Sequence, residues 1–352
     1  MEGLQHMKKL VLLFFGLGLA LSLKAQDPQF SQFYNAPLYL NPGFTGITPQ
    51  QRVVANHRLQ WPNLPQAYST YAVSYELFIG ELKSGFGLMA HTDLQGSSGW
   101  RTTSASLLYS YKLRVSKDWV VSPGLIFGYG QQSISGDLTL GDELDSGVPT
   151  SDPDVNRLGT EGYFDIGSGV IFYNRQLWLG VAAYHLNQPN KSVLGGDDRL
   201  PMKLNVHGGM RIPLKSGMKI SGKIDYLTPS FIYRSQGPFQ QLDLGLQYHI
   251  EPVAIGFWYR GIPVPRAFQL EAAEEKDNLQ DALAFVLSLQ FNTFQVGYSY
   301  DFTISELGTD TGGAHEVSII YEFVTKPFRR GVKKKYRQLP CPTFNSKKGF
   351  WN

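Results

Sequence analysis

Apolar and polar residues alternate with period two in the stretch Phe294–Phe302, and the pattern recurs along most of the chain. Its even-numbered residues are apolar or aromatic, and those between them are Gln295, Gly297, Ser299 and Asp301. Such alternation predicts a β-strand with one apolar and one polar face. The apolar face points inward in a soluble sandwich and outward, toward lipid, in an outer-membrane barrel.

Segments with this alternation predict about fourteen strands, an even number as in bacterial outer-membrane barrels. We expect them at residues 52–61, 67–79, 84–93, 101–113, 117–130, 162–173, 176–186, 202–213, 217–227, 239–249, 252–261, 281–291, 293–303 and 315–325.

The connections between these strands fall into two classes of length. Short turns are expected at ELK, VSK, NRQ, LKS and the step Asn292–Thr293, and long loops at 131–161, 187–201, 228–238, 262–280 and 304–314. Short turns at one end and long loops at the other are typical of outer-membrane barrels. We therefore predict an all-β fold, a transmembrane antiparallel β-barrel over residues 51–325, with both termini on the periplasmic, short-turn side.

Composition agrees with a barrel and excludes other classes. Charged residues make up 17% and aromatic residues 13% of the chain, which has 37 glycines. A mean hydropathy of −0.19 excludes a bundle of membrane-spanning helices, whereas alternation hides the membrane signal of a barrel. With Cys341 as the one cysteine, an intrachain disulfide and a cysteine-rich metal site are both impossible.

The N-terminus has the features of a secretory signal peptide. The basic residues of Met7–Lys9 precede the apolar run Leu10–Leu23, and Ala25 lies at a suitable cleavage point. We expect residues 1–25 to be removed and the mature chain to begin at Gln26. The alternative is a buried N-terminal helix.

Residues 26–50 contain aromatic residues, Pro, Asn and Gly without strand or helix periodicity. They predict an ordered, extended signature segment, which could plug the lumen, dock on a periplasmic partner, or seal the lower rim of the barrel. The candidate partner-binding residues of this segment are Phe30, Phe33, Tyr34, Tyr39, Asn41 and Pro42.

Residues 326–352 form a basic tail that contains no acidic residue. Clustered cations attract anionic lipid headgroups, peptidoglycan or an acidic protein face. Apolar anchors favour docking on a periplasmic partner, and a disordered end is the alternative. The candidate residues are Lys333, Lys334, Lys335, Phe350 and Trp351. Nucleic acid is not an expected partner of an exported chain.

Several charged residues fall on the polar face of predicted strands and are expected in the lumen. They are Lys112, Asp165, Asp225, Asp243, Arg260 and Asp301. We expect them to pair and fix the interior, the alternative being a role in conduction or substrate binding. The acidic residues of loop 131–161 could bind calcium, but their spacing is not that of an EF-hand, and solvated charge is the simpler interpretation. Loop 262–280 is a second candidate surface.

The sequence contains no catalytic constellation. Its histidines lie on separate strands, without the spacing of a metalloprotease motif, and its loop serines lack a matched base. We expect neither enzymatic activity nor a cofactor.

Four stretches of the chain match motifs of a known family. They are QDPQFSQFYNAPLYLNPGFTG (26–46) and HRLQWPNLPQAYSTYAVSYE (57–76), with weaker matches at LGVAAYHLNQP (179–189) and GYSYDFTIS (297–305). Through these motifs the chain resembles the PorP/SprF family of the type IX secretion and gliding motility apparatus of Bacteroidetes. The resemblance implies an outer-membrane barrel needed for secretion or surface anchoring of large adhesins and proteases. It also implies association with the periplasmic ring lipoprotein.

We therefore expect a non-enzymatic component of the type IX system in the outer membrane. Its expected partners are other components of that system, a secreted surface protein and outer-membrane lipid. One alternative is an outer-membrane channel or transporter for hydrophobic or small solutes. Another is an outer-membrane enzyme such as a phospholipase, against which the missing catalytic triad argues.

Overall fold

The computed structural model describes residues 27–48, 51–64, 67–96, 99–134, 160–193, 196–214, 225–262, 282–291, 293–304 and 308–323. Its strands are β1 (Gln51–Gln60), β2 (Tyr68–Ile79), β3 (Ser84–Gln95), β4 (Trp100–Tyr111), β5 (Leu113–Arg114), β6 (Val120–Ile134), β7 (Thr160–Tyr173), β8 (Leu177–Tyr184), β9 (Lys203–Met210), β10 (Ile212–Pro213), β11 (Tyr226–Gln236), β12 (Phe239–Ile250), β13 (Val253–Ile262), β14 (Ala282–Phe291), β15 (Phe294–Thr303) and β16 (Ala314–Phe323). Short helical turns are η2 (Phe33–Asn35), α2 (Pro37–Leu40), η3 (Pro42–Phe44) and η5 (Thr309–Thr311).

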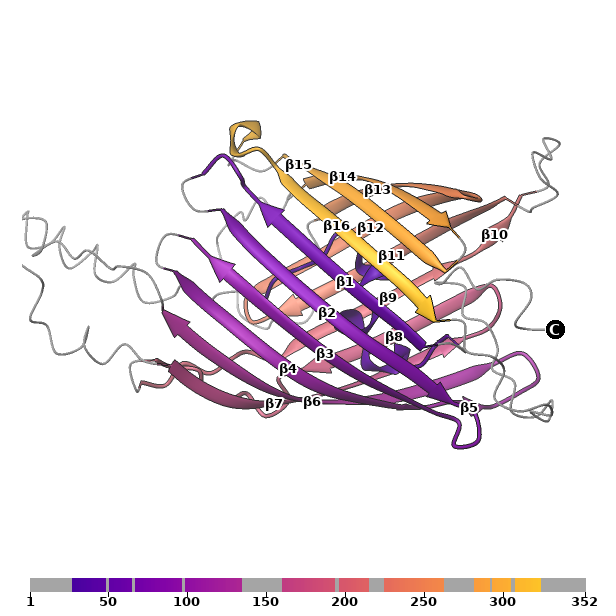
Figure 1. Cartoon of the computed structure of the whole chain (residues 1–352), viewed down its shortest axis with the longest axis horizontal. Helices are drawn as coiled ribbons and strands as arrows, with labels where there is room; N and C mark the ends of the chain where they lie inside the picture. The colour runs from indigo at the N-terminus through magenta and orange to yellow at the C-terminus, as the bar shows by residue number, and fades with distance from the viewer. Residues whose placement is uncertain are drawn as a thin grey trace, which may run out of the picture.

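The strands form one closed antiparallel barrel (Figure 1). β1 pairs with both β2 and β16, and β11 pairs with both β9 and β12, so the sheet has no free edge. The two-residue strands β5 and β10 prolong β4 and β9. The barrel therefore has fourteen full strands, as the alternation predicts.

The wall has an apolar outer face and a packed, largely polar inner face. On β13, Phe257 is 62% exposed whereas its neighbour Trp258 is 3% exposed. On β15, Tyr298 and Phe302 are exposed whereas Asp301 is buried. An apolar exterior around a filled interior is the pattern of a barrel that faces lipid.

Among the described residues, no helix is both long enough and apolar enough to cross a membrane.

One region differs from the prediction. The predicted long loop 228–238 is wrong, because Tyr226–Gln236 form β11 and only residues 237–238 connect it to β12. Gly237, at φ 57°, and Pro238 make this tight turn. The predicted strand 217–227 shares only its last two residues with β11, and its residues up to 224 lie outside the described part of the chain. β11 has polar residues on both faces and contains Pro229, so its sequence does not alternate clearly between apolar and polar residues.

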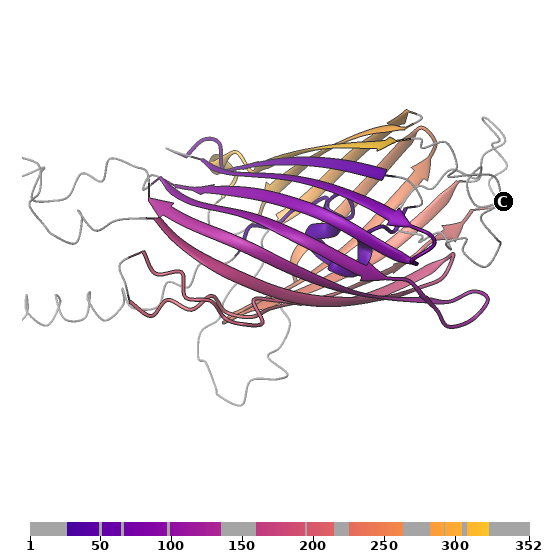
Figure 2. The same ribbon diagram turned by 60° about the horizontal axis from the view of Figure 1, so that its bottom comes forward.

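Residues 27–48, called the plug below, lie inside the barrel (Figures 1 and 2). Nearly all of its side chains from Phe30 onward are buried. The end of the barrel where loops 185–202 and 263–281 join strands is called the long-loop end, and the opposite end the short-turn end. The plug starts beside Lys203 at the long-loop end and descends to β1, which begins at the short-turn end.

This path differs from the expectation that both termini lie on the short-turn side. Asp27, the first described residue, lies at the long-loop end, because the segment runs through the lumen before it enters β1. The predicted signal peptide and basic tail lie outside the described residues.

Candidate functional site

The lower half of the plug packs directly against a wall lined with glycine. A Cβ atom on Gly124 of β6 would lie 2.4 Å from the carbonyl carbon of Pro42, and one on Gly85 of β3 would lie 2.1 Å from the carbonyl oxygen of Thr45. A Cβ on Gly169 of β7 would lie 2.3 Å from Asn41 Oδ1. Only glycine allows the plug to approach so closely.

Asn41 joins this half of the plug to three strands. Its Nδ2 lies 3.3 Å from the carbonyl oxygen of Val170, 3.1 Å from that of Val181, and 3.1 Å from His207 Nε2. Its Oδ1 accepts a hydrogen bond of 2.8 Å from the backbone N–H of Gly43, which caps η3. Asn41 therefore fixes the plug against β7, β8 and β9.

Charged groups hold the end of the plug nearest β1. Lys112 Nζ donates to the carbonyl oxygen of Gly43 at 3.0 Å and to Ser122 Oγ at 2.8 Å. Glu76 Oε2 accepts from the backbone N–H of Gly46 at 2.6 Å, and Glu76 also pairs with Arg52. Since both carboxylate and guanidinium are buried, their pairing compensates for lost hydration.

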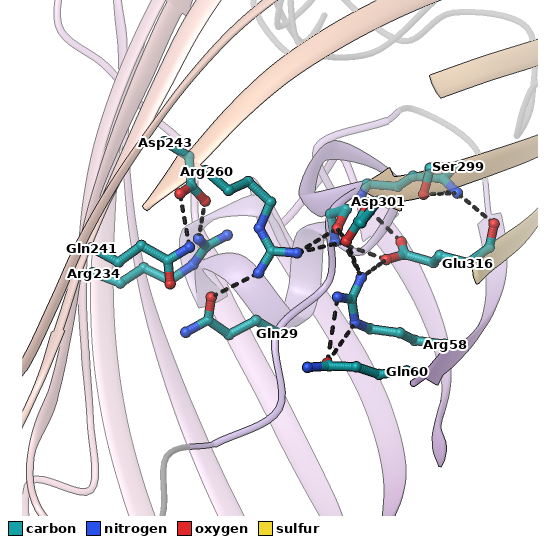
Figure 3. A network of polar contacts seen from close by, with 12 residues as sticks. Gln29, Arg58, Gln60, Arg234, Gln241, Asp243, Arg260, Ser299, Asp301 and Glu316 are labelled. Atoms are coloured by element: carbon teal, nitrogen blue, oxygen red, sulfur yellow. Dashed lines mark hydrogen bonds and ion pairs between the residues drawn. The ribbon is translucent and has the colours of Figure 1, made fainter. Parts of the chain in front are cut away.

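A buried ionic network contacts the plug close to the long-loop end (Figure 3). Arg58 Nη1 and Arg260 Nη1 lie 2.8 Å and 2.7 Å from Asp301 Oδ2. Arg58 Nη1 also lies 3.4 Å from Glu316 Oε2. The carboxylate of Glu316 accepts the backbone N–H groups of Ser31 at 2.7 Å and of Gln32 at 3.0 Å. Two arginines thus balance two carboxylates, and the plug backbone completes the network.

A second buried pair lies beside this network in Figure 3. Arg234 of β11 pairs with Asp243 of β12. Asp243 Oδ1 also accepts from Gln241 Nε2 at 2.9 Å and from the backbone N–H of Gly261 at 3.1 Å. These contacts satisfy the carboxylate within the wall.

A clasp around Asp27 holds the start of the plug at the long-loop end. Asp27 Oδ2 lies 3.1 Å from Lys203 Nζ and 2.9 Å from His185 Nε2. Gln236 donates to Asp27 Oδ1 at 3.2 Å and accepts from its backbone N–H at 3.0 Å. The other ring nitrogen of His185 lies 2.9 Å from Asp165 Oδ1.

His185 follows the last residue of β8 and lies in a connection. Burial by itself lowers the pKa of His185, but the carboxylates of Asp27 and Asp165 outweigh burial and raise this pKa to about 9. At neutral pH the ring is therefore an imidazolium that bridges the plug and the wall.

A cavity of about 80 Å³, called the vestibule below, lies beside the clasp. The residues that line it include Asp27, Tyr39, His91, Asp165, Tyr184 and His185. Among the described residues, no group of three His, Cys, Asp or Glu side chains is arranged to hold a metal ion.

The structure places the predicted residues of the signature segment inside the barrel. Phe30, Phe33, Tyr34 and Asn41 are buried, and Tyr39 is half-buried. The ring of Phe33 packs edge-on against that of Trp258 at 4.7 Å. In this arrangement these side chains contact the barrel, and their binding of a partner stays a prediction.

The predicted lumen charges are brought together only in part. Arg260 and Asp301 share one network, whereas Asp165, Asp243 and Lys112 each belong to another. Asp225 belongs to none of these networks. It lies just before β11, and its carboxylate accepts a hydrogen bond of 3.3 Å from Tyr248 Oη. Lys333, Lys334, Lys335, Phe350 and Trp351, and the acidic residues 137–154, lie outside the described residues.

Sequence reasoning missed Arg58, Glu316 and the clasp residues. Strand alternation carried a signal for Glu316, since Val317 and Ile319 point outward and Glu316 must then point inward. No comparable signal identified Asp27, because it precedes any regular element.

Solved structures similar to this chain include a transporter, a porin and a siderophore receptor. The toluene transporter TodX of P. putida is 10% identical, with a TM-score of 0.48, over 83% of this chain and 95% of that one. A mutant porin of Rh. blastica is 8% identical, with a TM-score of 0.32, over 78% of this chain and 98% of that one. The siderophore receptor PirA of Acinetobacter baumannii is 9% identical, with a TM-score of 0.34, over 72% and 43% of the two chains.

Such low identities carry no information about function. A comparison with curated protein sequences found no match. The family described as type IX secretion system membrane protein PorP/SprF matches residues 22–321. The chain therefore belongs to the PorP/SprF family of type IX secretion system membrane proteins.

Proposed function

We propose that this chain is a plugged, non-conducting, non-enzymatic barrel that anchors a secreted surface protein in the outer membrane. The PorP/SprF family consists of secretion-system membrane components and is not a family of enzymes. The observation that carries the proposal is the plug, which contacts the wall near the long-loop end, at the middle of β8 and β9 through Asn41, and near the short-turn end. A lumen occupied in this way favours an anchor over a conduit.

The two ends of the barrel take different partners in this proposal. The long loops face the cell exterior and hold the secreted protein, an adhesin or a protease. The short turns face the periplasm, so the basic tail, which follows β16 at that end, contacts the ring lipoprotein. Aromatic anchors supply affinity and clustered charge speeds the approach.

A pull-down in mild detergent tests this assignment. An affinity tag is placed between β6 and β7, within residues 135–159, and bound proteins are identified by mass spectrometry. We expect a large secreted protein together with a periplasmic ring lipoprotein. A variant truncated after residue 325 is the matched control, and it should keep the secreted protein but lose the lipoprotein. Recovery of the barrel alone contradicts the proposal.

The alternative is a channel for hydrophobic or small solutes. The purified chain is compared in lipid bilayers with a variant that lacks residues 27–48, whose folding is checked by heat-modifiable migration on a gel. We expect solute flux only after the plug is removed. Solute flux through the intact chain would contradict the anchoring proposal and support a channel.

A further inference from the structure

The two ends of the plug, residues 27–30 and residues 41–48, are held by different kinds of contact. Residues 41–48 lie backbone to backbone against the glycine-lined wall. Residues 27–30 precede the first helical turn and are held mainly by polar contacts. Phe30, their one fully buried apolar side chain, belongs with Ala36 and Ala72 to a small cluster, and Tyr39 packs against both this cluster and the main core. Tyr39 Oη also donates to the carbonyl oxygen of Pro28 at 2.7 Å, so movement of residues 27–30 would break contacts with Tyr39 but not the backbone packing of the lower plug against the glycine-lined wall.

Three side chains at the ends of neighbouring strands converge on the carboxylate of Asp27. Lys203 opens β9, Gln236 closes β11, and His185 follows β8. Lys203 Nζ and His185 Nε2 lie 3.1 Å and 2.9 Å from Asp27 Oδ2, and Gln236 Nε2 lies 3.2 Å from Asp27 Oδ1. Two cations and one amide around a single carboxylate form a complete anion site, and charge-assisted hydrogen bonds of this kind are strong. The ligand in this site belongs to the chain itself.

Residues 27–30 also divide the space at the long-loop end. Asp27 and Pro28 line the vestibule on one side. Pro28, Gln29 and Phe30 line a smaller cavity of about 20 Å³, whose other residues include Asn205 and Arg234. Tyr39 and Lys203 line both cavities. Displacement of residues 27–30 would join the two cavities and deepen the vestibule.

We propose that Lys203, His185 and Gln236 form a carboxylate-binding site, which Asp27 fills as an internal ligand until a partner's carboxylate displaces it from the long-loop end. Residues 27–30 then act as a strap that leaves the wall. The exchange conserves charge, since the incoming carboxylate replaces the one that leaves and the buried cations keep a counter-ion. The strap ends at Ser31, whose N–H and hydroxyl stay fixed by Glu316 and Asp301.

The first experiment measures thiol labelling of the purified full chain in detergent, so its outcome is independent of the role in secretion. In a Cys341→Ser background, Pro28→Cys reports on the strap and Leu38→Cys, at a site 1% exposed, reports on the lower plug. Arg199→Cys, at an exposed site near the long-loop end, normalises reactivity. Asp27→Ala should raise labelling at position 28 by about tenfold or more and leave position 38 protected.

Asp27→Asn, which retains size and loses charge, serves if the alanine variant folds poorly, and Asp198→Asn at an exposed site is its matched control. Unchanged labelling at position 28 overturns the strap. Equal labelling at positions 28 and 38 overturns it as well, because the whole plug would then have left.

The second experiment supplies the carboxylate. N-acetylaspartate is titrated into the chain with ionic strength held constant by chloride. We expect it to raise labelling at position 28 in the otherwise native chain and to bind Asp27→Ala measurably by calorimetry. Adding Lys203→Met to Asp27→Ala should abolish that binding. Binding that persists without Lys203, or an effect that chloride reproduces, refutes the carboxylate site.

Discussion

Gly124 offers the sharpest test of how the plug is seated. In Gly124→Ala the new Cβ would lie 2.4 Å from the carbonyl carbon of Pro42 and 2.5 Å from the backbone nitrogen of Gly43. Ordinary van der Waals contact begins at 3.4 Å, so the plug and β6 must separate by about 1 Å. Both contacting groups are backbone, so no side chain can rotate away to relieve the clash.

Overpacking of this kind costs about 1–3 kcal/mol. Since each 1.4 kcal/mol is a factor of ten in an equilibrium constant, the fraction of chains with an unseated lower plug should rise by about one to two orders of magnitude. We would measure it as labelling of Leu38→Cys, and as the temperature at which the barrel loses its heat-resistant mobility on a gel.

Gly256→Ala is the matched control, since Gly256 also lies on a strand and its Cβ would meet only ordinary contacts at 3.4–3.6 Å. We expect this variant to label and melt like the parent chain. If the two alanine variants prove indistinguishable, the lower plug does not rest on Gly124 in solution and the glycine-lined wall has another explanation.

Three further changes test other parts of the structure. Arg58→Ala leaves the carboxylate of Glu316 without its arginine partner and should cost about 3–5 kcal/mol in thermal unfolding, whereas exposed Arg199→Ala should cost under about 1 kcal/mol. His185→Gln should lower the free energy of unfolding by on the order of 3 kcal/mol below pH 6.5, because the pKa of His185 is raised from 6.5 to about 9 on folding. This difference from the parent chain should vanish as pH rises through about 9, where the folded chain also loses the proton. A pH-independent difference would contradict the imidazolium bridge. Phe257→Arg puts a charge on the exposed outer face and should cost up to about 2–4 kcal/mol on folding into lipid vesicles; no cost would argue against lipid contact there.

Strand alternation predicts most of the barrel because the side chains of a strand alternate strictly between its two faces. The same rule predicts that Asp301, Arg260 and Lys112 point into the lumen; in the structure all three side chains are buried, Arg260 against Asp301 and Lys112 against the plug. It failed at β11, where Pro229 and polar residues on both faces removed the contrast. A one-residue shift in a predicted strand exchanges its inward and outward side chains, so alternation predicts the inward face only where the other face is clearly apolar.

Strand alternation could not predict which side chains contact one another inside the lumen. Arg58 and Asp301 are 243 residues apart, and they meet only because β1 closes the ring against β16. The plug has no periodicity at all, so its composition indicated order but not its path. The inward glycines of β6 and β7 were visible in the sequence, yet a glycine indicates a close approach without naming what approaches.

The distribution of plug contacts bears on why a barrel would fill its own lumen. Asn41 ties the plug to β7, β8 and β9, while Glu316 and Asp301 tie it to β15 and β16 on another part of the ring. A ring linked across its interior resists flattening, so the loops at one end and the turns at the other keep a fixed spacing. In the anchoring role proposed above, such links would transmit force between a protein held at one end of the barrel and a protein held at the other. We infer that the clasp at Asp27 is placed above these links so that a partner can release the strap without loosening the ring.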